Sequence, residues 1–160
     1  MPKIHSTIRC LLIPSGGGQL LLPSTLVAEV FSYNEPELVF NDQPKWLLGM
    51  INWREQRVPL LSIEEALSLH QNEAPSPKRY HTVVLYGLES TQTMPFYGFR
   101  ATNVLSSLAV VEKTLTRFNV EKRKGLLFNV EHDSNHVLLP DVNYLENLLI
   151  KSQIFSYLTL

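Results

Sequence analysis

Short apolar runs separated by polar turn residues recur along the chain, a pattern typical of an all-β protein with minor helices. The run from Ser6 to Pro14 predicts a first strand, the glycines at 16–18 a turn, and Gln19–Leu22 the returning strand. The next apolar stretch, residues 26–33, suits either a strand or a short helical turn, and its periodicity does not decide between them.

The segment from Trp46 to Leu67 carries the clearest hairpin pattern. A strand enters at Gly49, a polar break follows at residues 54–56, and an apolar strand returns from Val58. A short helix is expected after it, from about Ile63 to His70. No nucleophile, metal ligand or phosphate-binding loop lies in the segment, which favours a role in protein–protein contact.

A polar, proline-containing stretch at residues 71–79 predicts a linker, because two prolines close together break regular structure. After it, strands are expected at 80–88, 96–99 and 104–112, with a late hairpin over 126–131 and 137–139. A helix is expected over 142–152, with Asp141 as its N-cap. Both halves thus run strands first, a hairpin late and a helix last. This predicts one domain over 1–160 made of two small barrel lobes, at about 6–70 and 80–150.

The bulk composition is that of an ordinary globular protein. Of 160 residues, 44% are hydrophobic and 18% charged, so a buried core is expected. The net charge of −1 gives no field to attract nucleic acid or an anionic membrane. The one cysteine, Cys10, cannot form an internal disulfide, and no apolar run approaches the roughly 20 residues of a membrane span. With no secretory signal pattern at the N-terminus, a cytoplasmic location is expected.

Candidate chemistry is sparse. The glycines at 16–18 lack the Gly-Lys-Ser/Thr that a phosphate-binding loop requires, so a hairpin turn is favoured. His132 and His136 flank a turn containing Asp133, but a stable zinc site usually needs three or four converging ligands. No Gly-x-Ser-x-Gly motif occurs, and Cys10 lies within a predicted strand. We therefore expect no enzyme activity, no cofactor and no metal.

Residue type alone leaves the candidate binding residues open. Arg54 and Arg57 are either solvated turn cations or, next to Trp53, part of an interface, since Arg and Trp are enriched at interface hot spots. Val27 and Val30 lie in an amphipathic stretch where packing into the core is the ordinary role.

The order Gly49, Met50-Ile51, Asn52-Trp53-Arg54 and Val58-Pro59-Leu60-Leu61 resembles the signature of the CheW-type coupling proteins of bacterial chemosensory arrays. That family shows a glycine, an aliphatic pair, Asn-Leu-Arg-Gly, and then an aliphatic-Pro-aliphatic strand. The resemblance covers about Ile8 to Leu149, although only residues 49–61 are specific. It implies two five-stranded, SH3-like barrels around a shared hydrophobic core.

The resemblance also implies a non-catalytic adaptor between a chemoreceptor's cytoplasmic tip and the regulatory domain of a CheA-type histidine kinase, in chemotaxis or twitching motility. The matching arginine, Arg54, supports receptor coupling, whereas Val27 and Val30 match positions lining the groove that takes the receptor tip. Trp46 either belongs to the core or caps that groove. The expected partner-binding residues are Arg54, Val27, Val30, Gly49, Asn52, Trp53 and Trp46. The alternative is a small ligand-binding sensor or enzyme domain on tandem barrels, which a deep polar pocket would support.

Three positions depart from the family pattern. Glu55 stands where the family has its turn glycine, and a glutamate with positive φ would be strained by roughly 1 kcal/mol. A turn of another type, or one residue longer, is therefore expected. Ser62 replaces an acidic residue after the return strand, and Trp53 replaces a smaller aliphatic residue. These departures suggest a divergent branch, closer to the pilus-linked (twitching) systems than to the flagellar one.

Overall fold

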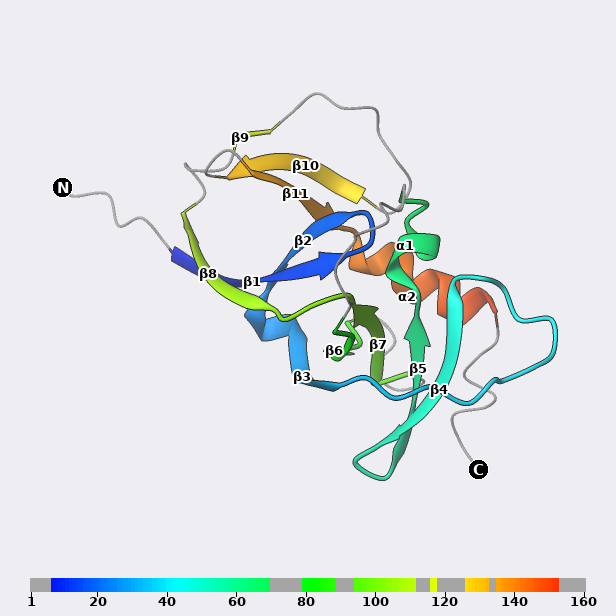
Figure 1. The fold of residues 1–160 in the computed structure, drawn as a ribbon. Helices are drawn as coiled ribbons and strands as arrows, with labels where there is room; N and C mark the ends of the chain where they lie inside the picture. The colour runs from blue at the N-terminus through cyan, green and yellow to red at the C-terminus, as the bar shows by residue number, and fades with distance from the viewer. Residues whose placement is uncertain are drawn as a thin grey trace.

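The computed structural model describes residues 7–69, 79–88, 94–111, 116–117, 126–132 and 135–152. Within them the chain forms two sheets and three short helical elements (Figure 1). In order across the first sheet, the strands are β8 (Ser106–Val111), β1 (Thr7–Ser15), β2 (Gly18–Pro23), β11 (Asn135–Pro140), β10 (Leu126–His132) and β9 (Thr116–Arg117). Across the second they are β3 (Val27–Ser32), β6 (His81–Tyr86), β7 (Phe96–Ala101), β5 (Gln56–Leu61) and β4 (Leu47–Trp53). The helices are η1 (Ser24–Leu26), α1 (Ile63–Ala66) and α2 (Val142–Lys151).

The two sheets repeat one arrangement. Each sheet contains two hairpins, β1–β2 and β10–β11 in the first and β6–β7 and β4–β5 in the second. The second strands of the two hairpins pair in parallel, β2 with β11 and β7 with β5. A single strand, β8 or β3, pairs antiparallel with the outer strand of the first hairpin. The repeated order of elements expected from the sequence is therefore present.

The expected division into lobes at 6–70 and 80–150 is wrong, because each sheet takes strands from both halves of the chain. Strand β3 leaves the sheet of β1 and β2 to pair with β6, and β8 returns to pair with β1. The residues expected to form the linker lie outside the described part of the chain, except Arg79. A duplicated pattern of elements does not require that each copy folds on itself.

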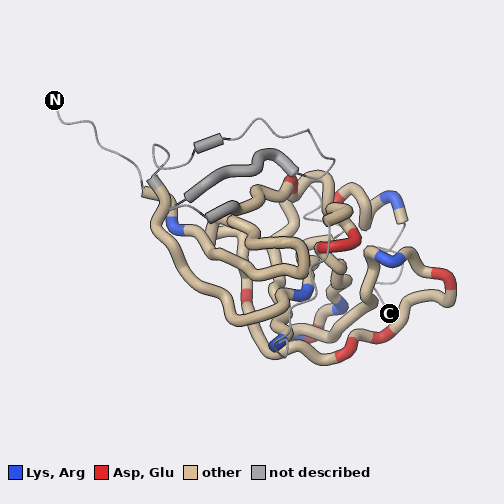
Figure 2. Tube along the Cα trace, turned by 45° about the horizontal axis from the view of Figure 1, so that its top comes forward, with Lys and Arg blue, Asp and Glu red and all other residues tan. Residues whose placement is uncertain are grey.

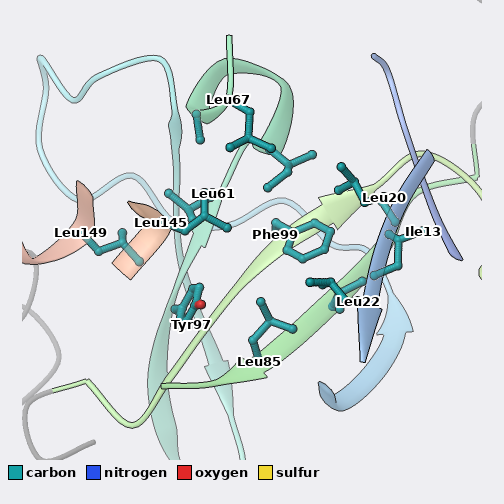
Figure 3. Packing of buried hydrophobic residues seen from close by; sticks show 14 of the residues in the cluster. Ile13, Leu20, Leu22, Leu61, Leu67, Leu85, Tyr97, Phe99, Leu145 and Leu149 are labelled. Atoms are coloured by element: carbon teal, nitrogen blue, oxygen red, sulfur yellow. The ribbon is translucent and has the colours of Figure 1, made fainter. Parts of the chain in front are cut away.

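The main hydrophobic core lies between the sheets (Figure 3). Ile13, Leu20 and Leu22 reach it from the first sheet and Phe99 and Tyr97 from the second. Helix α2 adds two leucines, Leu145 and Leu149, that have 1% and 0% of their surface exposed. This is the shared core that the resemblance implies.

Each sheet also buries its other face. Alternate residues on β1 and β2 place Cys10 and Leu21 in a separate cluster with Val110 and Val137. In the second sheet, Val84 belongs to a cluster on the face opposite the one where Val83 and Leu85 enter the main core. Residues on one face of the strands therefore enter the shared core and those on the other face form a smaller cluster, as alternation along barrel strands requires. The element order and sheet topology confirm the expected all-β architecture.

Local capping explains where the helices begin. Ser62 Oγ accepts a hydrogen bond from the Glu65 backbone N–H at 3.5 Å, so the serine acts as N-cap of α1. Asp141 caps α2, as expected, through a 3.1 Å hydrogen bond from the Asn143 N–H. Helix α1 is shorter than expected because Ser68 has a positive φ of 53°, which ends the helical backbone.

The ambiguous stretch at 26–33 forms a strand preceded by one turn of 3₁₀-helix. The periodicity of this stretch fits a strand or a helical turn, and pairing with β6 selects the strand. The pairs run from Val27–Leu85 to Ser32–His81. A bulge at Ala28 lies in this pairing, between Val27 and Glu29.

Candidate functional site

The hairpin of β4 and β5 ends in a two-residue turn, Arg54–Glu55, closed by the pair Trp53–Gln56. Both turn residues have positive φ, 47° for Arg54 and 62° for Glu55. The expected change of turn type or length is therefore wrong: the turn is short and left-handed, the combination found in type I′ hairpins. Two residues with side chains occupy a conformation that favours glycine, at a cost of about 1 kcal/mol or more each.

Trp53 lies beneath this turn and is buried, with 6% of its surface exposed. It packs with Val58 and Val84, and its ring meets Phe96 edge-on at 4.8 Å between centroids. The indole Nε1–H donates a hydrogen bond to Glu29 Oε2 on β3. Trp53 faces the cluster that it shares with Val58 and Val84, so its side chain is not open to a partner in the isolated chain. Its expected role in partner binding stays a prediction.

Arg54 is displayed above the indole. Its guanidinium carbon lies 4.7 Å from the centre of the Trp53 ring, and its Nη2 lies 3.3 Å from Glu29 Oε1. The arginine side chain is nevertheless 63% exposed and that of Glu29 39% exposed. These contacts orient the cation without burying it.

Glu29 joins both residues to the opposite edge of the sheet. The Trp53 hydrogen bond, and the charge of Arg54, hold the pKa of the Glu29 carboxyl below its ordinary value despite some desolvation. The carboxylate therefore stays ionised at neutral pH. Since β3 and β4 are the two outer strands of the second sheet, Glu29 links its edges and closes it at this end.

Gly49 has a packing role. Its φ is 145°, and a Cβ placed there would lie 2.2 Å from the backbone oxygen of Glu37. The neighbouring Met50 exchanges two backbone hydrogen bonds with Glu37, of 2.8 and 2.9 Å. Glycine is required here because the loop after β3 crosses directly over β4.

Asn52 is exposed on β4 and lines a cavity of ≈ 240 Å³ between this strand, the end of β3 and the loop after it. Arg57 lies opposite Asn52 on β5 and pairs with Glu37 at 3.7 Å. Arg57 is only 21% exposed, so it is less of a solvated turn cation than Arg54. Pairing of either arginine with Glu55 is not seen among the described residues.

The remaining expected site residues lie apart from the turn. Val27 and Trp46 are half-buried and pack against the main core. Val30 is 36% exposed on β3. Trp46 precedes β4, at the end opposite Trp53, roughly 20 Å away for a strand that rises about 3.3 Å per residue. The structure thus places Arg54, Trp53 and Asn52 at one end of β4 and Val30 next to Glu29 on β3, whereas Val27 and Trp46 pack against the main core.

Sequence reasoning missed Glu29 and Glu37. The available signal for Glu29 was a single acidic residue within an otherwise apolar strand, since such a residue needs a hydrogen-bonding partner when it is half-buried. No comparable signal marked Glu37, because its role depends on a backbone crossing that only the fold creates.

The remaining candidate chemistry concerns metal ions and the cysteine. No group of three or more His, Cys, Asp or Glu is placed to hold a metal ion in the described residues, and the side chains of His132 and His136 lie outside them. Cys10 is buried, as expected, and burial raises the pKa of its thiol. Among the described helices, none has the length and apolar character needed to cross a membrane.

Comparison with known proteins points in one direction. The family model of the CheW-like domain matches residues 9–147. Among solved structures, the scaffolding protein TtCheW from Thermoanaerobacter tengcongensis is similar, with a TM-score of 0.69, 11% sequence identity, and 89% of each chain covered. At that identity the likeness shows a shared fold. A search of curated proteins finds no match.

Proposed function

Because this chain belongs to the family of CheW-like domains, we propose that it is a non-catalytic adaptor that couples chemoreceptors to a CheA-type histidine kinase. In this proposal the hairpin of β4 and β5 contacts the kinase's regulatory domain, and Arg54 at its tip couples the state of the receptor to that contact. A second surface, near Val30, receives the receptor's cytoplasmic tip. The protein would act in the cytoplasm, in chemotaxis or twitching motility.

One observation carries the proposal: an exposed arginine held in place on a strained turn. Arg54 is held by the Glu29 carboxylate and by the face of the Trp53 indole beneath it, yet most of its side chain remains open to solvent. Fixing a side chain before binding lowers the conformational entropy that association costs. Strained backbone that surrounding contacts maintain is a feature of binding and switching sites.

The proposed mechanism is differential binding. The receptor can bias the kinase only if the adaptor contacts differ between the kinase's states, by an amount that typically lies at 1–3 kcal/mol. A rigid, oriented cation suits this task because a small displacement of the partner's acidic groups would change its interaction energy.

The direct test is binding of the purified protein to the regulatory domain of a CheA-type kinase. We expect a Kd in the micromolar range, about −8 kcal/mol, without nucleotide or metal. Isothermal titration calorimetry would measure it, with the regulatory domain of an unrelated kinase as control. Equal binding to the control, or a strict need for zinc, would refute the proposed function.

A further inference from the structure

The cavity beside Asn52 has a mixed lining that includes two carboxylates. Phe31 and Ile51 supply apolar surface, Asn34 and Thr82 supply further polar groups, and Glu35 and Glu37 supply the carboxylates. No lysine, arginine or histidine among the described residues lines it. At ≈ 240 Å³ it is smaller than the roughly 300–1,000 Å³ of pockets that enclose small ligands. It suits a single long side chain better than a metabolite.

The loop that carries both carboxylates is acidic, and its third acidic residue, Asp42, lies outside the cavity lining. Residues 33–46, the loop from β3 to β4, carry three acidic residues and one basic residue, Lys45 (Figure 2). Glu37 shares its carboxylate with Arg57 at 3.7 Å. Glu35 is exposed, and the described residues place no basic side chain within ion-pair distance of it.

We propose that this cavity, the basic-side-chain socket, takes a lysine or arginine of the kinase's regulatory domain. The aliphatic stem would lie on Phe31 and Ile51 while the cationic head reaches Glu35 and Glu37. Long basic side chains bind in this way because their stems are apolar and only their heads require water or a counter-charge. The inference rests on the proposed function, since it names the chemistry that the partner presents at the same surface.

The position of the socket places a negative site beside the positive charge of Arg54. Ile51 and Asn52 line it, and the next two residues along the chain are Trp53 and Arg54. An exposed cation and an acidic socket therefore lie next to each other at one end of β4. A matching partner carries an acidic group opposite Arg54 and a basic side chain opposite Glu35, and a shifted docking register would bring like charges together.

The test uses the full chain and the purified regulatory domain. Glu35→Gln together with Glu37→Gln removes two negative charges and keeps side-chain size. Asp42→Asn together with Glu65→Gln removes the same charge from exposed positions outside the cavity. We expect the first variant to bind about tenfold more weakly at 50 mM salt than the second, a difference that shrinks at 500 mM as screening increases. Glu35→Gln alone leaves the contact between Glu37 and Arg57 intact, and it should show part of the loss of affinity seen for the double variant.

Each outcome decides between the claims. If both double variants bind like the wild type, or lose affinity equally, the socket is refuted while the adaptor function stands. If the wild-type chain does not bind the regulatory domain, the proposed function fails and the inference fails with it. Replacing basic residues of the regulatory domain by Gln provides a second measurement. One of these changes should weaken binding to the wild-type chain and have little further effect on the Glu35/Glu37 variant.

Discussion

Two hairpin turns of this protein are each tied to another element by a glutamate, but they differ in burial. At the β1–β2 turn, the Gly16 backbone N–H donates a 2.8 Å hydrogen bond to Glu64 of α1, and Glu64 is 4% exposed. At the β4–β5 turn, Glu29 holds Trp53 and Arg54 and remains open to solvent. The first glutamate stabilises the fold from inside, whereas the second orients a residue at the surface.

The two turns also differ in which residues adopt a positive φ. The glycine-rich turn places its left-handed residue at Gly18, where φ is 133° and the strain is small. The other turn forces Arg54 and Glu55 into positive φ. The backbone strain therefore lies in the turn whose side chains are exposed. This indicates that the residues of the β4–β5 turn serve a role other than easy folding.

The largest expected effect comes from removing the support under the surface turn. Trp53→Ala should lower the free energy of unfolding by about 3–5 kcal/mol, because a buried ring leaves a cavity against Val58, Val84 and Phe96. Urea denaturation would measure it. Trp53→Phe, which loses the N–H but keeps a ring, should cost less. A loss below 1 kcal/mol for the alanine variant would mean that the turn does not depend on the indole.

The buried glutamate should matter more for stability than the exposed one. Glu64→Ala leaves the Gly16 N–H without its partner and should cost about 1–3 kcal/mol. Glu29→Ala should cost less, because the Glu29 side chain is 39% exposed, so water can take the place of its carboxylate beside Arg54 and the Trp53 indole N–H. Parallel denaturation curves compare them, and equal losses would remove the distinction drawn between the two turns.

Restoring a glycine should relieve the strained turn. Glu55→Gly is expected to raise the free energy of unfolding by up to about 1 kcal/mol, because glycine adopts positive φ freely. Gly18→Ala should act in the opposite direction at the other turn. Thermal melting of both variants gives the signs, and a destabilising Glu55→Gly would show that the glutamate side chain makes a contact of its own.

The smallest expected effect depends on pH. Since the folded-state pKa of Glu29 is lowered, its contribution is present at neutral pH and is lost as pH falls through that lowered pKa. The fluorescence of Trp53 should report this protonation, because the carboxylate accepts the indole hydrogen bond. Glu29→Gln should abolish this fluorescence change. If the variant shows the same pH-dependent change as the wild type, the signal comes from another group.

Local sequence patterns predicted where the strands and helices lie better than which strands pair with each other. The strands β1, β2, β10 and β11 and the Asp141 cap follow from alternation, turn residues and capping, all of which act over a few positions. The exchange of β3 and β8 between the sheets was missed. Which sheet a strand joins depends on distant burial, and the periodicity of residues 26–33 contains no information about it.

The site shows the same limit. A hairpin with Arg54 at its tip was predicted, because the polar break at residues 54–56 is visible in the sequence. The burial of Trp53 was not, since a residue next to a turn can face either side of the sheet until the register is fixed. Glu29 lies 24 positions from Trp53, and their contact exists only because the sheet curls until its edges meet.

The most direct test of the account is Arg54→Ala, measured for binding and stability together. Its ion pair and cation–π contact are exposed, so the free energy of unfolding should change by about 1 kcal/mol or less. Arg9→Ala, an exposed arginine on the other sheet, is the matched control, since Arg57 also anchors Glu37. Affinity for the kinase's regulatory domain should fall by about 1–3 kcal/mol for Arg54→Ala and remain unchanged for the control. A folded Arg54→Ala protein that binds like the wild type would contradict the account.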